Sequence, residues 1–91
     1  MDSKWRFYKD PRHGWLEVHK DEILEVGIEN DITSCSYVNG DYVYLEEDYD
    51  IGIFLSKKGY NKLPRDVVEE VYTDGNSIVT SYKPYHSSFI K

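Results

Sequence analysis

Cysteine is almost absent from this chain: Cys35 is the single one among 91 residues. One cysteine cannot form an internal disulfide, which excludes a small secreted scaffold held together by disulfides. No apolar run reaches the length of about 20 residues that spans a membrane. Met1–Tyr8 also lacks the apolar centre of a secretion signal. We therefore expect a cytoplasmic protein that makes no membrane contact.

The sequence also lacks the common patterns of enzyme chemistry. It has no phosphate-binding glycine loop and no nucleophile elbow. The histidines His13, His19 and His86 do not have the close spacing of a zinc site. A calcium loop begun at Glu46 or Asp48 puts neither the glycine nor the glutamate where that loop needs them. We predict no cofactor, no metal site and no catalytic residue.

What the chain does contain is enough for one folded domain. It has nine tyrosines, two tryptophans and three phenylalanines, and 40% of its residues are hydrophobic. This composition argues against disorder, and the length is too small for two separate cores. We predict a single domain over residues 1–91, with a loosely ordered tail at 83–91.

Charge is unevenly distributed along the chain, whose net charge is −6. Residues 17–50 contain eleven acids against one base, Lys20, and so carry −10, while 1–16 and 51–91 carry +2 each. A negative field of this kind repels nucleic acids and attracts basic proteins at rates that fall with salt. We expect a basic protein as partner and no direct binding of nucleic acid.

The first part of the chain predicts two strands and a short helix. Residues 5–8 and 15–18 are short aromatic and β-branched runs joined by turn-forming residues, which favours a hairpin. Residues 21–26 predict a helix of at most two turns, with acids in its first turn. Gly27 is expected to end this helix in the left-handed conformation, so that Ile28 folds back on Ile23.

The clearest local signal is Asn39-Gly40, a pair that favours a two-residue type I′ turn. It predicts a hairpin over 33–46 with Val38 opposite Asp41. The two faces of this hairpin would hold Tyr37, Tyr42, Tyr44 and Cys35 on one side, and Val38, Val43 and Leu45 beside Ser34 and Ser36 on the other. We expect the Val/Leu face to pack on a helix and Cys35 to be buried. The tyrosine face is either half-exposed or covered by the chain termini.

The last part of the chain predicts a second helix and a third hairpin. The helix covers 50–58, is capped by Asp48 or Asp50 and ends at Gly59. The hairpin pairs 67–72 with 77–82 around the turn signal Asp74-Gly75. The order β-β-α-β-β-α-β-β describes a small α+β domain with a mainly antiparallel sheet of hairpins and two short helices.

Tyrosines and carboxylates are interleaved in and beside the central hairpin, and two interpretations of them stay open. The tyrosines pack in the core while the carboxylates are solvated or cap the next helix, or both groups form a surface that binds a partner. The candidate partner-binding residues are Tyr37, Asp41, Tyr42, Tyr44, Glu46, Glu47, Asp48 and Asp50.

Two motifs resemble those of a group of small phage, prophage and plasmid proteins of bacteria that have no assigned activity. They are His13-Gly14-Trp15-Leu16-Glu17-Val18 and Tyr44-Leu45-Glu46-Glu47-Asp48 with Asp50, and Ser36-Tyr37 lies between them. The resemblance covers residues 6–56. It departs at Tyr49, where the group has cysteine, and becomes loose in the last third of the chain. It implies a mobile-element protein in the bacterial cytoplasm and assigns no functional residue.

These observations lead to one main hypothesis and two alternatives. In the main hypothesis, a non-enzymatic accessory protein of a phage or mobile element binds a basic host protein, such as a nuclease or a defence component, through its acidic, tyrosine-rich surface. One alternative is a small hydrolase-like enzyme in which His13 or His86 shares a pocket with a tyrosine or a carboxylate. The other is a self-associating structural protein. The main hypothesis predicts a monomer or a weak homodimer.

Overall fold

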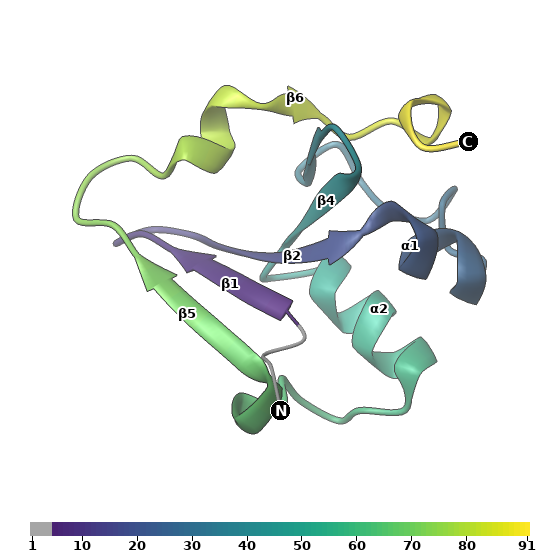
Figure 1. Cartoon of the computed structure of the whole chain (residues 1–91), viewed down its shortest axis with the longest axis horizontal. Coiled ribbons are helices and arrows are strands. Elements are labelled where there is room, and N and C mark those ends of the chain that lie inside the picture. The colour runs from purple at the N-terminus through teal and green to yellow at the C-terminus, as the bar shows by residue number, and fades with distance from the viewer. Residues whose placement is uncertain (1–4) are drawn as a thin grey trace.

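A six-stranded sheet forms the framework of the protein (Figure 1). The computed structural model describes residues 5–91, and its strands follow the order β5-β1-β2-β4-β3-β6. Their bounds are Trp5–Lys9 for β1, Gly14–His19 for β2, Tyr37–Asn39 for β3, Tyr42–Glu46 for β4, Val68–Tyr72 for β5 and Lys83–Pro84 for β6. Neighbouring strands are antiparallel except β5 beside β1. This confirms the predicted α+β fold with a mainly antiparallel sheet. Residues 1–4 of the predicted domain lie outside the described residues.

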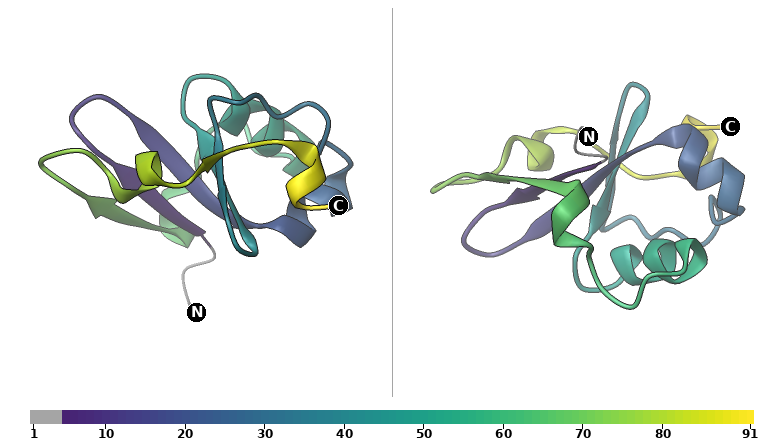
Figure 2. Two further views of the ribbon diagram at one scale, coloured as in Figure 1. Left: turned by 90° about the horizontal axis from the view of Figure 1, so that it is seen from above. Right: turned by 60° about the horizontal axis from the view of Figure 1, so that its bottom comes forward.

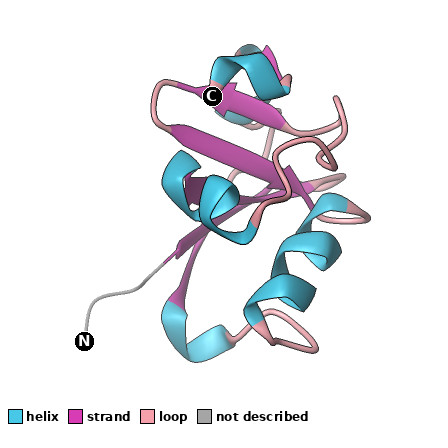
Figure 3. Ribbon diagram, turned by 90° about the vertical axis from the view of Figure 1, so that its right-hand side faces the viewer, coloured by secondary structure: helices cyan, strands magenta, loops and turns pink. Residues whose placement is uncertain are grey.

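Two α-helices lie next to each other beside the sheet (Figure 3). They are α1, Lys20–Val26, and α2, Asp50–Lys58, and both end at a glycine with positive φ, as predicted: Gly27 at 73° and Gly59 at 88°. Ile28 donates its N–H to the carbonyl of Ile23, and both side chains are fully buried, so the predicted fold-back contact is confirmed. No helix in residues 5–91 is long and apolar enough to cross a membrane.

The main core lies between the sheet and the two helices. Its sheet residues include Leu16, Val43 and Leu45, and its helix residues include Ile23 and Phe54, all of them fully buried. The Val/Leu face of the central hairpin therefore packs against the helices, as the alternation of its side chains predicts. The apolar stripe of α2 supplies Phe54 to this core because residues three and four apart share one helix face.

The other face of the sheet carries a second, aromatic cluster. Trp15 and Tyr44 are its buried rings, and Tyr8, Tyr37 and Tyr82 pack around them. Val79, from the short 3-10 helix η2 (Ile78–Ser81), covers part of this cluster. Figure 2, right panel, shows η2 and α2 on opposite sides of the strands. A segment near the C-terminus thus covers part of the tyrosine face, while Tyr42 stays 44% exposed.

The register of the central hairpin differs from the predicted one by two residues. Val38 pairs with Val43 and Asn39 with Tyr42, so the turn consists of Gly40 and Asp41. The carbonyl of Asp41 accepts the N–H of Lys20 at 2.8 Å, which fastens this turn to the start of α1. A shift of two residues leaves the side chains within β3 and β4 on their predicted faces.

The predicted third hairpin is wrong. Strand β5 pairs in parallel with β1, and residues 78–81 form η2 instead of a partner strand. The carboxylate of Asp10 accepts the N–H of Ser77 at 3.3 Å, which ties this segment to the β1–β2 turn. Asp10 also accepts the N–H groups of Arg12 and His13 within that turn. In place of pairing with β5, the segment buries Val79 on the aromatic cluster.

The tail at 83–91 was expected to be loosely ordered, but it packs on the domain. Strand β6 pairs with β3, and Tyr85 and Ile90 are 5% and 3% exposed. The hydroxyl of Tyr85 donates to the carbonyl of Glu29 at 2.5 Å. Two further 3-10 helices, η1 (Arg65–Val67) and η3 (Ser87–Phe89), complete the chain.

Candidate functional site

The eight residues predicted to bind a partner do not form one surface. Strand β4 separates them, with Asp41 and Tyr42 at its start and 46–48 at its end. At about 3.3 Å per residue, roughly 13 Å of strand lies between Tyr42 and Glu46. Residues that are close in the sequence therefore lie at opposite ends of β4 and belong to two separate surfaces.

The end of the sheet around Asp41 and Tyr42 has balanced charges. Lys20 Nζ lies 3.4 Å from the Asp41 carboxylate. The ring of His19 packs edge-on against Tyr42, with 5.4 Å between the ring centroids, and its Nδ1 accepts the N–H of Asp21. Tyr37, between the two ends, is half-buried against Trp15. This end offers an exposed ring but little net negative charge.

The other end holds a short loop of concentrated negative charge, Glu46–Tyr49, which we call the acidic loop. The carboxylate of Glu46 accepts the N–H groups of Asp48 at 2.8 Å and of Tyr49 at 3.0 Å. These bonds fix the backbone of the loop. Asp48 is exposed and forms no ion pair with residues 5–91, and Tyr49 is 61% exposed.

The acidic loop is packed against the β1–β2 hairpin at Gly14. Glu47 donates its N–H to the Gly14 carbonyl at 2.9 Å, and its carboxylate lies 3.2 Å from Lys9 Nζ. A Cβ at Gly14 would collide with the Phe7 ring and lie 3.1 Å from Glu47 Oε2. Glycine is therefore required here by close approach. The His-Gly-Trp motif and the acidic motif, far apart in the sequence, contact each other at this point.

Asp50 is fully buried, so it lies outside any partner-binding surface, and the predicted cap is wrong. The first helical residue is Asp50 itself, Tyr49 precedes it, and no side-chain hydrogen bond caps the helix. The Asp50 carboxylate instead accepts the N–H and the hydroxyl of Thr33, at 3.1 and 2.8 Å, and the hydroxyl of Ser36 at 2.5 Å. It joins the start of α2 to the segment before β3.

Tyr44 is also buried, at 4% exposure, and belongs to a hydrogen-bonded group on the aromatic face. Its hydroxyl donates to Glu17 Oε2 at 2.8 Å, and the hydroxyl of Tyr8 approaches the same oxygen at 3.5 Å. Burial raises the pKa of Tyr44 first, and the hydrogen bond to Glu17 and its charge raise it further. Burial and then Glu17 raise the pKa of Tyr8 as well. Both phenols are therefore protonated donors at neutral pH.

Sequence reasoning did not connect Glu17 and Tyr8 with Tyr44. The available signal was the period-two alternation in the first two strands, which puts Tyr8 and Glu17 on the face opposite Phe7 and Leu16. Pairing across β1, β2 and β4 then brings Glu17 opposite Tyr44. That pairing joins strands that are distant in the sequence, and local patterns do not reveal it.

His13 lines a hollow of about 230 Å³ together with Asp10 and Asp74, and His86 lines a separate one of about 250 Å³ together with Glu29 and Tyr85. His13 stacks on Trp15 at the tip of the first hairpin. His86 Nδ1 lies 2.8 Å from the Ser88 hydroxyl and accepts the Ser88 N–H, which is the local capping of η3. Within residues 5–91, no carboxylate holds the other ring nitrogen of His86. A serine–histidine pair needs such a group to orient its base.

Cys35 is exposed, which corrects the prediction that it is buried. It precedes β3 instead of lying within a strand, because β3 begins at Tyr37. Its N–H donates to the Thr33 hydroxyl at 3.2 Å in the turn that leads to the hairpin. The prediction failed because it placed Cys35 in the strand. In the turn before β3, its side chain belongs to neither face of the sheet.

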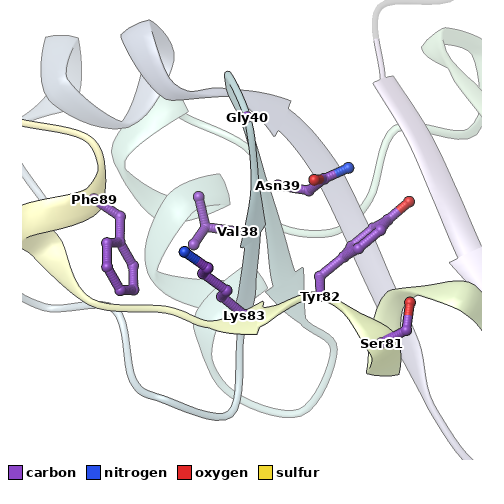
Figure 4. A pocket seen from close by; sticks show the side chains of 7 residues that line it. All are labelled: Val38, Asn39, Gly40, Ser81, Tyr82, Lys83 and Phe89. Atoms are coloured by element: carbon purple, nitrogen blue, oxygen red, sulfur yellow. The ribbon is translucent and has the colours of Figure 1, made fainter.

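A hollow of about 420 Å³ lies where β6 meets β3, and it contains none of the eight predicted residues. Lys83 points toward Phe89, with Nζ 5.5 Å from the ring centroid, whereas Tyr82 points away from them (Figure 4). Lys83 is the charged member of the lining. Tyr82 and Lys83 are its titratable side chains, and because they point apart the hollow does not present them as an acid–base pair.

No metal-binding arrangement is present in the described part of the chain: no group of three or more His, Cys, Asp or Glu side chains could hold an ion. Comparisons with protein-family models, curated proteins and solved structures find no match. The resemblance to mobile-element proteins therefore stays a prediction.

Proposed function

We propose that this chain is a non-enzymatic binding protein that engages a basic protein through the acidic loop, residues 46–49. The observation that carries the proposal is that Glu46 holds the loop backbone while Asp48 and Tyr49 are exposed on it. A fixed loop loses little entropy on binding. Tyrosine is a preferred anchor of interfaces, and an exposed carboxylate speeds the encounter with a basic surface.

The proposed surface is narrower than the one expected from sequence. It keeps Glu46, Glu47 and Asp48 and adds Tyr49, while Tyr44 and Asp50 are excluded by burial. Asp41 and Tyr42 lie at the other end of β4, and Tyr37 is half-buried against Trp15, so the proposal leaves these three residues out of the contact. Glu47 contributes less charge than its neighbour Asp48, because Lys9 already pairs with it.

We also propose a biological setting for this binding protein. The resemblance of the two motifs supports an accessory protein of a phage or mobile element, acting in the bacterial cytoplasm on a host protein. The target would be a protein with a basic groove, such as a nuclease or a defence component. The net charge of −6 supports a partner of opposite sign.

Charge reversal at the exposed loop tests this function. The tagged chain and its Asp48→Lys and Tyr49→Ser variants would be used to capture proteins from bacterial lysate at low and at high salt. We expect a basic partner that is retained at low salt and lost at high salt, and that neither variant retains. Asp66→Lys is the matched control, because Asp66 is exposed in η1 and changes the net charge equally. Equal retention by Asp48→Lys and wild type would contradict the proposal.

Self-association is a second candidate, favoured by one observation. Strand β5 lies at the end of the strand order and pairs with β1 alone, so its other edge can pair with another strand. Glu69 and Glu70 lie in the middle of β5, and antiparallel pairing of two copies would bring these like charges together. We therefore expect a monomer or a weak homodimer in sedimentation equilibrium, and a tight dimer would favour this candidate.

A further inference from the structure

A groove of about 280 Å³ lies between α2 and the segment that follows it. Phe7, Ile51 and Leu55 line it, each no more than 7% exposed, together with Leu63. These side chains also belong to the main core or pack against it. The core is therefore accessible along this groove, and a ligand lying there would contact apolar side chains.

Gly52 is an exposed residue of the groove lining. It lies inside α2 with no positive φ, and a Cβ added to it would meet nothing within 4 Å. Neither backbone conformation nor close packing among the described residues therefore requires a glycine. An interior glycine weakens a helix relative to alanine. The missing side chain leaves space above the apolar floor at the expense of helix stability.

The rim of the groove has available positive charge in an otherwise acidic protein. Lys62 lines it and forms no ion pair with residues 5–91. Arg65 also lines it, and its single ion pair, to Glu70 at 3.4 Å, is largely exposed. The third charged residue of the lining, Glu47, is paired with Lys9. A ligand on the apolar floor would therefore meet two cations at the rim.

We propose that this groove binds a small aliphatic carboxylate. Its hydrocarbon chain lies over Gly52 on the apolar floor, and its carboxylate lies at Lys62 and Arg65. Guanidinium groups suit carboxylates because they can donate two parallel hydrogen bonds. The volume is slightly below the 300–1,000 Å³ that is typical of pockets for drug-sized ligands, which favours a short to medium chain. Glu47 of the acidic loop also lines the groove, so the two proposals concern neighbouring surfaces, and each is tested by its own variants.

Titration with octanoate, followed by the amide NMR signals of the full chain, tests the proposal. We expect saturable shifts centred on Gly52, Leu55 and Leu63. Octanol tests the need for charge and acetate the need for a hydrocarbon chain, and we expect both to bind at least tenfold more weakly. A peptide that ends in leucine also offers an aliphatic side chain next to a carboxylate, and it is the second ligand to be titrated. Binding of that peptide without binding of octanoate would overturn the choice of ligand.

Two sets of variants separate binding from folding. Gly52→Leu fills the groove and removes the interior glycine, so we expect at least a tenfold loss of octanoate affinity with no loss of thermal stability. The double variant Lys62→Gln with Arg65→Gln should reduce the affinity for octanoate to that for octanol. Lys57→Gln is the control, because Lys57 lies on α2 but does not line the groove. Unchanged binding by Gly52→Leu, or equal binding of octanoate and octanol by wild type, would overturn the proposal.

Discussion

The two faces of the sheet are built from different chemistry. The face toward the helices is aliphatic, and Leu16, Val43 and Leu45 are fully buried on it. The opposite face consists of aromatic rings around a carboxylate, Glu17, and only part of it is covered by the C-terminal segment. The first arrangement removes apolar area from water, which is the main source of stability. The second holds the hydroxyls of Tyr44 and Tyr8 at the Glu17 carboxylate while leaving the Tyr42 ring accessible.

The comparison predicts that the largest losses of stability occur on the helix side. Phe54→Ala removes a fully buried ring from the main core and should lower the free energy of unfolding by about 3–5 kcal/mol. Urea unfolding followed by circular dichroism measures this loss. Tyr49→Ala, which removes an exposed ring, should change stability by no more than about 0.5 kcal/mol. A similar loss in both variants would show that the two environments do not differ as described.

Asp50 is a fully buried charged residue on the side of the sheet that the helices cover. Its replacement tests how much a buried polar network adds to the stability of that side. Asp50→Asn keeps the size but removes the charge that three hydrogen bonds from Thr33 and Ser36 stabilise. We expect a loss of about 2 kcal/mol, because hydrogen bonds to charged groups are the stronger ones. Asp48→Asn, at an exposed position two residues earlier, is the control in the same urea experiment. An unchanged free energy of unfolding for Asp50→Asn would mean that the hydrogen bonds of the Asp50 carboxylate do not stabilise the fold.

On the aromatic face we expect a smaller effect. Tyr44→Phe retains the buried ring but removes the donor to Glu17, for an expected loss of about 1 kcal/mol. Tyr82→Phe is the matched control, because the Tyr82 ring belongs to the same cluster but its hydroxyl makes no hydrogen bond within residues 5–91. Its stability in urea should match that of wild type. Equal losses in the two variants would assign the effect to ring packing instead of the hydrogen bond.

Alkaline pH tests the buried tyrosine hydroxyls on both faces. Burial, followed by the charges of Glu29 and Asp50, raises the pKa of Tyr85 from 10.0 to about 12. A pKa that is raised in the folded state means that the stability contribution is complete below pH 10 and is lost as the pH rises toward 12. Tyr85→Phe should therefore lose less stability than wild type over this interval, measured by urea unfolding at each pH. Tyr44→Phe should show the same direction of change. Parallel pH profiles for Tyr85→Phe and wild type would contradict the linkage.

Much of the fold was predictable because its signals are local. The bounds of α2 match the prediction, and Gly27 and Gly59 end their helices as expected. The alternation in 37–46 assigned the two hairpin faces correctly even though the register was wrong, since a shift of two residues preserves the faces. The candidate site was predicted less well. Burial of Tyr44 and Asp50 depends on what packs over them, and the pattern within one segment does not contain that information.

The sequence by itself determined the fold class, the two helices, the faces of the central hairpin and the excess of negative charge. These depend on side-chain alternation, glycine conformation and composition, which act over a few residues or over the whole chain. Tertiary structure alone decided that β5 joins β1, that the segment 77–82 covers Tyr44, and that the acidic stretch is divided between two ends of β4. The physical reason is that these outcomes depend on competition between distant segments for the same surface.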